Sequence, residues 1–244
     1  MRIVFFGASH GYPEPNRKCS CSLVEVDGKR YFIDMGTNAA EGLATRRIPV
    51  DTIDSVFVTH MHGDHSNGII PFLDICCWKF LTSKPKIYMP QNPEAIKAPL
   101  RNWLSLNGVK LREDLEFFEV TEGEIFNDGN LKITAYKTQH TNNSYSYLLE
   151  AQGKRVLFSG DLSEKGPTID FPVSVLDKPL DLAICEAAHF KATEYLPIFK
   201  DNDNIKQICF NHYSDRFVES VVEMTRLLPH IPVYRAYDDS EINL

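Results

Sequence analysis

Apolar residues follow two different periodicities along the chain, and each periodicity predicts one kind of secondary structure. Short alternating or continuous apolar runs are typical of strands, whereas apolar residues three and four positions apart are typical of helices. The strand-like runs fall into a first set near residues 2–6, 22–34, 54–60 and 86–90, and a second set near 115–120, 131–138, 144–151, 155–160, 180–186 and 205–211. Helical spacing follows residues 60–65, covers Pro93 to Asn107 and covers Ser214 to Leu228. The pattern predicts an α/β protein with two mixed sheets packed face to face and helices outside, a four-layer αββα sandwich.

Turn signals and chain length refine this prediction. Asp27-Gly28 and Gln152-Gly153 predict hairpins between neighbouring strands, and Gly108 is expected to end the middle helix. No internal repeat divides the 244 residues, and 43% hydrophobic residues suffice for one large core. We therefore expect residues 1–244 to form one domain. Its core is expected to contain the aromatic side chains Trp78, Phe80 and Trp103.

Net charge and cysteine content indicate which partners and which cellular compartment to expect. The net charge of −7 and the pI of about 5.6 give no general positive field that would attract long nucleic acids. No apolar run reaches the roughly 18 residues of a membrane span, and the first residues enter a strand without a signal peptide. The six cysteines are scattered without a disulfide framework, so a cytoplasmic location is expected.

One short segment carries an unusual density of metal-binding side chains. Three of the eight histidines and one carboxylate, His60, His62, Asp64 and His65, lie within six consecutive residues. Imidazole nitrogen and carboxylate oxygen suit zinc and related divalent ions. The segment lies between a β-branched strand and a predicted helix, so rigid elements hold the turn on both sides. A solvated histidine-rich loop is the alternative, but such loops rarely recur in a metal-binding pattern elsewhere in the chain.

Here the pattern recurs at the ends of other predicted strands. Asp34, His140, Asp161 and His212 each end a strand-like run. In layered α/β folds, sites gather at one end of the strands because the loops converge there. We therefore expect these side chains to join the histidine-rich turn in one site.

The motifs together resemble a known family. The pattern T-H-x-H-x-D-H-x-x-G, completed by Gly68, resembles the signature of the metallo-β-lactamase-fold hydrolases, and His140, Asp161 and His212 follow in that family's order. The resemblance covers nearly the whole chain. The opening residues 5–11 and the closing residues 211–217 are most similar to the ribonuclease Z-like branch. That branch includes tRNA 3′-end nucleases, cyclic-nucleotide phosphodiesterases and other phosphodiesterases.

This resemblance implies a site for two metal ions. The first ion would be held by His60, His62 and His140, the second by Asp64, His65 and His212, and Asp161 would bridge them. Two divalent ions about 3.5–4 Å apart can share a hydroxide, because they lower the pKa of the bound water toward ~7. Asp64 would also orient that hydroxide. Zn²⁺ is the expected metal, although Mn²⁺ and Fe²⁺ accept the same ligands.

Asp34 is expected to act behind the ligands rather than among them. A carboxylate that accepts a proton from a ligand imidazole fixes the tautomer and orientation of that ring. The alternative is an ordinary turn residue before Met35 and Gly36.

The substrate expected from these features is a small phosphodiester. Ser214 and Arg216, beside His212, form a donor pair suited to an anionic phosphoryl group. The tRNA 3′-end nucleases of the branch carry a long arm between the third and fourth metal motifs. Only 20 residues separate His140 from Asp161 here, and two predicted strands fill them. The sequence therefore favours a small anionic substrate over tRNA, and it is compatible with a homo-oligomer.

A proton donor is expected near this site. The branch has a His-Glu-Ala-Thr stretch where this chain has Cys185 in place of the histidine, followed by Glu186, and His189 lies four residues after Cys185. His189 is expected to protonate the leaving group, as a general acid does. The alternative is a loop histidine packed beside Phe190.

Three further alternatives stay open. Acyl, thioester and lactone hydrolases share the first metal motif almost completely, so that motif alone does not separate them from phosphodiesterases. A non-hydrolytic redox or binding module is disfavoured because His62 and all the other ligands are present. Some phosphodiesterases of the branch bind an extra zinc through cysteines, but Cys19 and Cys21 are spaced C-x-C and are expected to be buried or shielded thiols.

Overall fold

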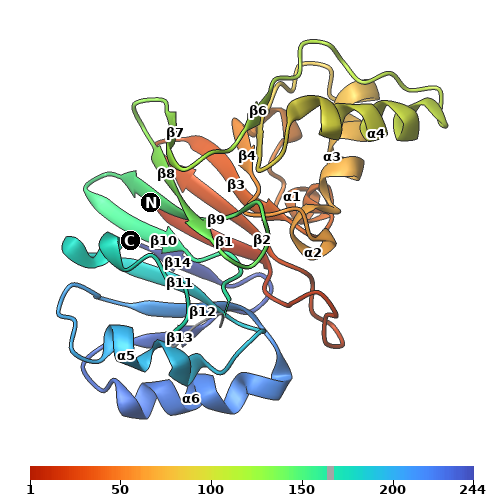
Figure 1. The fold of residues 1–244 in the computed structure, drawn as a ribbon. Helices are drawn as coiled ribbons and strands as arrows, with labels where there is room; N and C mark the ends of the chain where they lie inside the picture. The colour runs from red at the N-terminus through yellow and green to blue at the C-terminus, as the bar shows by residue number, and fades with distance from the viewer. Residues whose placement is uncertain (164–167) are drawn as a thin grey trace.

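The computed structural model, described here for residues 1–163 and 168–244, contains two β-sheets packed face to face (Figure 1). The first sheet consists of β1 (Arg2–Gly7), β2 (Cys21–Val26), β3 (Lys29–Met35), β4 (Ser55–Phe57), β5 (Lys86–Met89), β6 (Phe117–Glu119) and β14 (Glu241–Asn243). The second sheet consists of β7 (Gly123–Asn127), β8 (Lys132–Thr138), β9 (Ser144–Ala151), β10 (Lys154–Phe158), β11 (Leu182–Ala187), β12 (Ile208–Tyr213) and β13 (Val233–Arg235).

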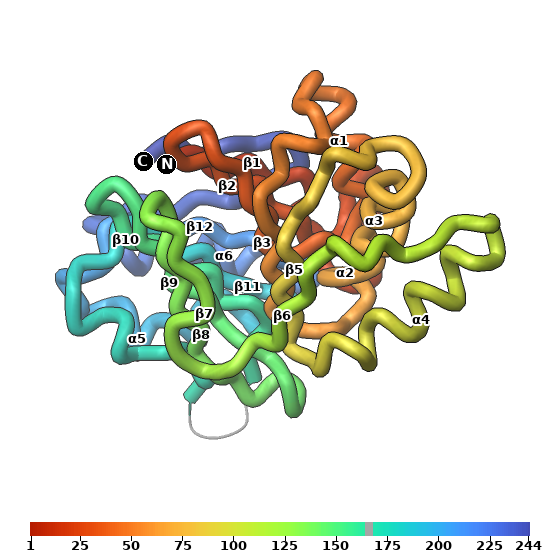
Figure 2. The backbone as a smooth tube through the Cα atoms, turned by 90° about the horizontal axis from the view of Figure 1, so that it is seen from above, coloured from red at the N-terminus to blue at the C-terminus, as the bar shows by residue number. Residues whose placement is uncertain are grey.

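Helices cover the outer face of each sheet. The α-helices are α1 (Ala39–Thr45), α2 (Gly63–Ser66), α3 (Ile69–Trp78), α4 (Pro93–Ser105), α5 (Leu196–Phe199) and α6 (Val218–Leu227). The short 3-10 helices in the described part of the chain are η1 (Val50–Thr52), η2 (Val173–Asp177), η3 (Ala192–Tyr195) and η4 (Asp215–Phe217). Viewed from above, α1 to α4 gather on one side and α5 lies on the other (Figure 2). None of the helices in the described ranges is long and apolar enough to cross a membrane.

Both sheets are mixed, which determines where loops can converge. The first sheet has the order β14-β1-β2-β3-β4-β5-β6, with antiparallel pairs up to β3 and parallel pairs from β3 to β6. The second has the order β13-β12-β11-β10-β9-β8-β7, with parallel pairs from β10 to β13 and antiparallel pairs elsewhere. Carboxyl ends of neighbouring parallel strands share one edge, so side chains that follow them meet there.

Clusters of buried apolar side chains pack between the sheets and between each sheet and its helices. Between the sheets, inward side chains such as Phe5, Ile33 and Tyr147 form a continuous cluster. A second cluster lies under α1, α3 and α4, and a third lies under α5 and α6. Burial of each large apolar side chain contributes about 1.5–3 kcal/mol. This arrangement confirms the predicted four-layer αββα sandwich.

The structure corrects the predicted membership of one strand. The run near residues 115–120 was expected in the second set, but β6 lies at the edge of the first sheet, where Ile87 pairs with Phe117. The same sheet gains β14 at its other edge. Strand-like periodicity identifies a strand but does not say which neighbour it pairs with, so this assignment needed the tertiary structure.

Two aromatic residues expected in the core lie at the surface. Trp78 and Trp103 are 55% and 54% exposed. They lie at or near the carboxyl ends of α3 and α4, and α4 projects beyond the sheets (Figure 1). Phe80 is partly buried against the core under these helices. The prediction was therefore wrong for both tryptophans.

The predicted turns are present. Asp27 and Gly28 have φ of 49° and 80°, and Gln152 and Gly153 have φ of 52° and 69°. Two consecutive residues with positive φ match the right-handed twist of a hairpin. Gly108, with φ of 71°, follows the end of α4.

Candidate metal centre

The predicted ligands converge where strands of both sheets end. Residues 60–65 follow β4, and His140, Asp161 and His212 lie at the ends of β8, β10 and β12. Two of the strand-end residues, Asp34 and His212, have positive φ of 57° and 52°. This region is uncommon for residues other than glycine and is often found at functional sites. The backbone conformation at these two positions directs both side chains toward the centre.

Glycines let the loops around the centre approach closely. A β-carbon on Gly36 would lie 1.6 Å from the carbonyl oxygen of Asp64, and one on Gly68 would lie 1.9 Å from the carbonyl oxygen of Thr37. No real β-carbon tolerates such distances, so only glycine fits. The histidine-rich turn is thereby packed against the loop that follows β3.

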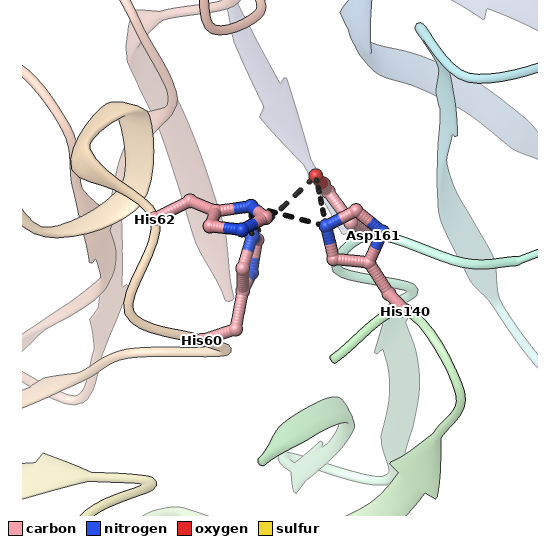
Figure 3. A group of neighbouring side chains, drawn as sticks. All are labelled: His60, His62, His140 and Asp161. Atoms are coloured by element: carbon pink, nitrogen blue, oxygen red, sulfur yellow. Dashed lines mark hydrogen bonds and ion pairs between the residues drawn. The ribbon is translucent and has the colours of Figure 1, made fainter. Parts of the chain in front are cut away.

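The first group contains His60, His62, His140 and Asp161 (Figure 3). Nδ1 of His62 lies 3.1 Å from Nε2 of His60 and 3.1 Å from Nε2 of His140. Oδ2 of Asp161 lies 3.5 Å from Nε2 of His60 and 3.6 Å from Nε2 of His140. Ring nitrogens and an oxygen that converge at these distances can bind one cation between them.

The second group contains Asp64, His65 and His212. Nε2 of His65 lies 3.5 Å from Oδ2 of Asp64, and Nε2 of His212 lies 3.8 Å from the same oxygen. Oδ1 of Asp161 lies 3.3 Å from each of these two ring nitrogens. The two oxygens of Asp161 therefore face different groups, which is the geometry expected of a shared carboxylate.

The chemistry of the cluster fits a divalent cation. Nε2 of His65 and Oδ1 of Asp161 are buried without a hydrogen-bond partner among the described residues. Buried polar atoms are nearly always satisfied, so such a pair indicates a missing partner such as an ion. Burial also lowers the pKa of His60 to about 2, which keeps its imidazole in the neutral, ligating form.

The electrostatic field around His65 favours positive charge. Burial lowers the pKa of His65, but the carboxylates of Asp161 and Asp34 outweigh it and raise that pKa well above its ordinary value. A field that favours a proton on this ring also favours a cation beside it.

Hydrogen bonds orient three of the candidate ligands from behind. Oδ2 of Asp34 lies 2.7 Å from Nδ1 of His65. Asp34 is itself held by the backbone N–H of Thr59, which donates to Oδ1 at 2.7 Å. Nδ1 of His60 lies 3.2 Å from Oγ1 of Thr59, and Nδ1 of His212 lies 3.1 Å from Oγ of Ser20. The roles of Thr59 and Ser20 were missed. No local sequence signal indicates that Ser20 contacts a residue 192 positions away, or that Thr59 meets Asp34.

His189 lies at the edge of the cluster. Its Nδ1 is 2.8 Å from Oε2 of Glu186, and its Nε2 faces Oδ2 of Asp161 at 3.8 Å. Glu186 is fixed by the backbone N–H groups of Leu162 and Ala188, which donate at 2.7 and 3.1 Å. Burial lowers the pKa of His189, but the hydrogen bond and the charge of Glu186 outweigh it and raise that pKa to about 9. Glu186 thus favours the protonated form of the ring, and the side chain of His189 is 40% exposed to solvent.

Ser214 and Arg216, the expected phosphoryl contacts, make their described contacts outside the cluster. Oγ of Ser214 accepts a hydrogen bond from the backbone N–H of Arg216 at 3.2 Å and so caps η4. The guanidinium of Arg216 is exposed and lies 5.0 Å from the ring centre of Phe217. A role in binding substrate would require this side chain to turn toward the centre.

The two cysteines near the amino terminus differ in their surroundings. Cys21 is buried, and burial raises the pKa of its thiol. Cys19 is half-buried, with Sγ 3.6 Å from the carbonyl oxygen of His10. Neither belongs to a group of potential metal ligands among the residues described.

The carboxylate of Glu14 fixes the loop that follows β1. Glu14 accepts hydrogen bonds from Oγ of Ser9 at 2.7 Å and from the backbone N–H of Asp215 at 2.8 Å, and its Oε1 lies 2.9 Å from Nε2 of His10. Burial raises the pKa of Glu14, but these hydrogen bonds outweigh it and lower that pKa to about 2. Glu14 thus ties the loop after β1 to the loop after β12.

We expect Glu14→Gln to lower the free energy of unfolding by about 1–3 kcal/mol at pH 7, because hydrogen bonds to a charged acceptor are lost. The carboxyl pKa is depressed in the folded state, so this stability is present above the ordinary pKa of 4.5 and is lost as pH falls toward 2. Urea unfolding between pH 7 and 2.5 should show the difference from wild type shrinking below pH 4.5. The exposed Glu122→Gln is the matched control, and a difference that stays constant with pH would contradict the assignment.

Comparison with known proteins gives one family and several structural neighbours. A family model described as anti-Pycsar protein Apyc1 matches residues 1–221. Ribonuclease BN of Erwinia tasmaniensis is 28% identical over 157 residues, which are 63% of this chain and 51% of that protein. Ribonuclease BN of Citrobacter koseri is 27% identical over 158 residues, with the same coverage of both chains. The chain thus spans about half the length of the curated relatives it matches.

Solved structures share the fold. The metallo-β-lactamase-fold protein YhfI from Bacillus subtilis superposes with a TM-score of 0.78 at 17% identity, over 99% of this chain and 98% of that one. The short form of human tRNase Z superposes with a TM-score of 0.74 at 21% identity, over 100% and 99% of the two chains. Unliganded yeast PDE1 has a TM-score of 0.73 at 11% identity, over 100% and 99%. These likenesses confirm the metallo-β-lactamase fold.

Proposed function

The chain belongs to the family of the anti-Pycsar protein Apyc1, and from this membership and its side chains we propose that it is a dinuclear metal-dependent hydrolase of small phosphodiesters. The observation that carries the proposal is Asp161, whose two oxygens face two separate groups of candidate ligands. Proteins named ribonuclease, tRNase Z and PDE1 are similar to this chain in sequence or in fold. Those names support a phosphoester as the bond that is cleaved.

The proposed ligands divide between two ions. His60, His62 and His140 would hold one ion, Asp64, His65 and His212 would hold the other, and Asp161 would contact both. When bound, divalent ions supply a water of lowered pKa and neutralise charge on a phosphoryl group. Zn²⁺ suits this nitrogen-rich donor set best, and Mn²⁺ and Fe²⁺ are the alternatives.

The chain's own residues would then position and protonate the substrate. Asp64 lies at the centre of the second group, where its carboxylate can orient an attacking water by accepting its hydrogen bond. His189, protonated and aimed at the cluster through Nε2, would donate its proton to the leaving oxygen. Glu186 would keep that ring in place through Nδ1. Arg216, with Ser214 beside it, would contact the anionic phosphoryl group from the loop after β12 once its side chain turns toward the centre.

A substrate screen tests this proposal. We expect purified protein, prepared without chelators, to contain about two divalent ions and to cleave bis(p-nitrophenyl) phosphate and other small phosphodiesters in preference to thioesters, lactones and tRNA precursors. The net charge of −7 gives no broad positive surface for tRNA. Efficient cleavage of a tRNA 3′ trailer at physiological salt would overturn the preference. Robust lactonase or thioesterase activity without phosphodiesterase activity would overturn the reaction class.

A further inference from the structure

A second pocket lies beside the candidate metal centre, between α4 and the histidine-rich turn. Its volume is about 220 Å³, and its lining includes Met61, Asn67, Met89, Leu100 and Trp103. Trp103 forms part of its wall from α4, and this large side chain is 54% exposed. Figure 2 shows α4 running past α2 on the same side of the molecule. An exposed indole over an open pocket is a surface that a ligand can cover.

The pocket and the metal centre share one short stretch of backbone. Met61 lies between two candidate ligands, His60 and His62, so its Cα is about 3.8 Å from the Cα of each. His60 and His62 belong to the first group of candidate ligands, whereas Met61 lines the pocket. The pocket therefore begins one residue from two candidate ligands, and a substrate arm that passes the exposed His62 would enter it.

The size and chemistry of the pocket fit a flat, uncharged ring. An apolar cavity of about 150 Å³ accepts benzene, so about 220 Å³ accommodates a substituted ring. The thioethers of Met61 and Met89 and the indole of Trp103 all make favourable contacts with aromatic faces. The amide of Asn67 offers one polar contact at the edge. No charged side chain is among the described residues that line it.

We propose that this pocket binds a planar aromatic or heteroaromatic ring carried by the substrate arm that does not leave. The inference rests on the proposed function, because the phosphoryl group must lie at the metal centre for that arm to reach the pocket. It adds a specificity determinant, Trp103, whose role is to bind the ring rather than to take part in the reaction. Recognition of a ring in this pocket would make diesters with a flat arm better substrates than diesters with a small alkyl arm.

Two substrates with the same leaving group separate ring binding from chemistry. Bis(p-nitrophenyl) phosphate and methyl p-nitrophenyl phosphate both release p-nitrophenolate, and only the first carries an aromatic second arm. We expect Trp103→Ala to lower the ratio of their kcat/KM values by about tenfold, mainly through KM for the diaryl substrate. Trp103→Phe retains a flat wall and should recover most of the ratio. Trp78→Phe, an equally exposed tryptophan on α3 outside the pocket, should keep the wild-type ratio.

A binding measurement tests the pocket independently of catalysis. The chain has two tryptophans, so in Trp78→Phe all indole fluorescence comes from Trp103. Titration with 4-nitrobenzylphosphonate should quench this emission, and methylphosphonate should not. Quenching together with the lowered ratio supports the pocket. An unchanged ratio in Trp103→Ala, or no quenching, overturns it even if both diesters are cleaved. Failure to cleave either diester instead counts against the proposed function, while the fluorescence titration still decides whether the pocket binds a ring.

Discussion

Replacing Asp161 by alanine is expected to release at least one metal ion and to reduce phosphodiester hydrolysis by on the order of 10³-fold or more, because metal-ion stabilisation is worth several kcal/mol. Asp161 is 2% exposed, and its oxygens face His60 and His140 on one side and His65 and His212 on the other. No other side chain among the described residues belongs to the first group and also contacts both histidines of the second. Metal analysis of the purified variant, paired with its rate on bis(p-nitrophenyl) phosphate, measures both losses.

Two further variants make this result interpretable. Asp161→Asn keeps the size of the side chain and removes its charge, so it should lose metal affinity while folding normally. Asp215→Ala removes an exposed carboxylate close in sequence to His212 and serves as the matched control for metal content. A purified Asp161→Ala protein that keeps two tightly held ions and full activity would show that the ligand assignment is wrong.

His189→Ala is expected to retain both ions yet to slow alkyl phosphodiesters by about 10²–10⁴-fold, the usual contribution of a positioned acid. Alkoxide leaves poorly unless it is protonated, whereas p-nitrophenolate leaves unaided, so p-nitrophenyl esters should be affected far less. The structure supports this role because Nδ1 of His189 is held by Glu186 and Nε2 faces the cluster.

The control for this prediction is His230→Ala, an exposed histidine that belongs to no group of potential ligands in the described residues. Glu186→Gln should show a milder form of the same leaving-group dependence, because Glu186 acts only by positioning the ring. Equal slowing of both substrate types in His189→Ala, or no slowing of either, would remove His189 from the mechanism.

Periodicity predicted most of the layers, and the side chains at the predicted strand ends lie close together in the structure. The alternating run before His140 and the apolar run before Asp161 became β8 and β10, and both residues lie in the centre. This worked because strand periodicity is local, and a fold with parallel strands collects their carboxyl ends at one edge.

Contacts between distant segments were not predictable in the same way. Ser20 supports His212 across 192 residues, and Thr59 reaches Asp34 because β3 and β4 are neighbours. The exposure of Trp103 depends on how far α4 extends past the sheet, which its helical periodicity does not encode. Each of these features is set by packing rather than by nearby sequence.

The wide separation of the ligands along the chain has a consequence for biosynthesis. His65 and His212 are roughly 150 residues apart, which corresponds to roughly 7–30 s of translation at about 5–20 residues per second. During that interval the growing chain carries the histidine-rich turn without the complete set of its partners. Ion binding that requires the finished site stabilises only the completed fold, by an amount that grows with the free ion concentration. The supply of divalent metal in the producing cell should therefore influence how much of this protein accumulates in the folded state.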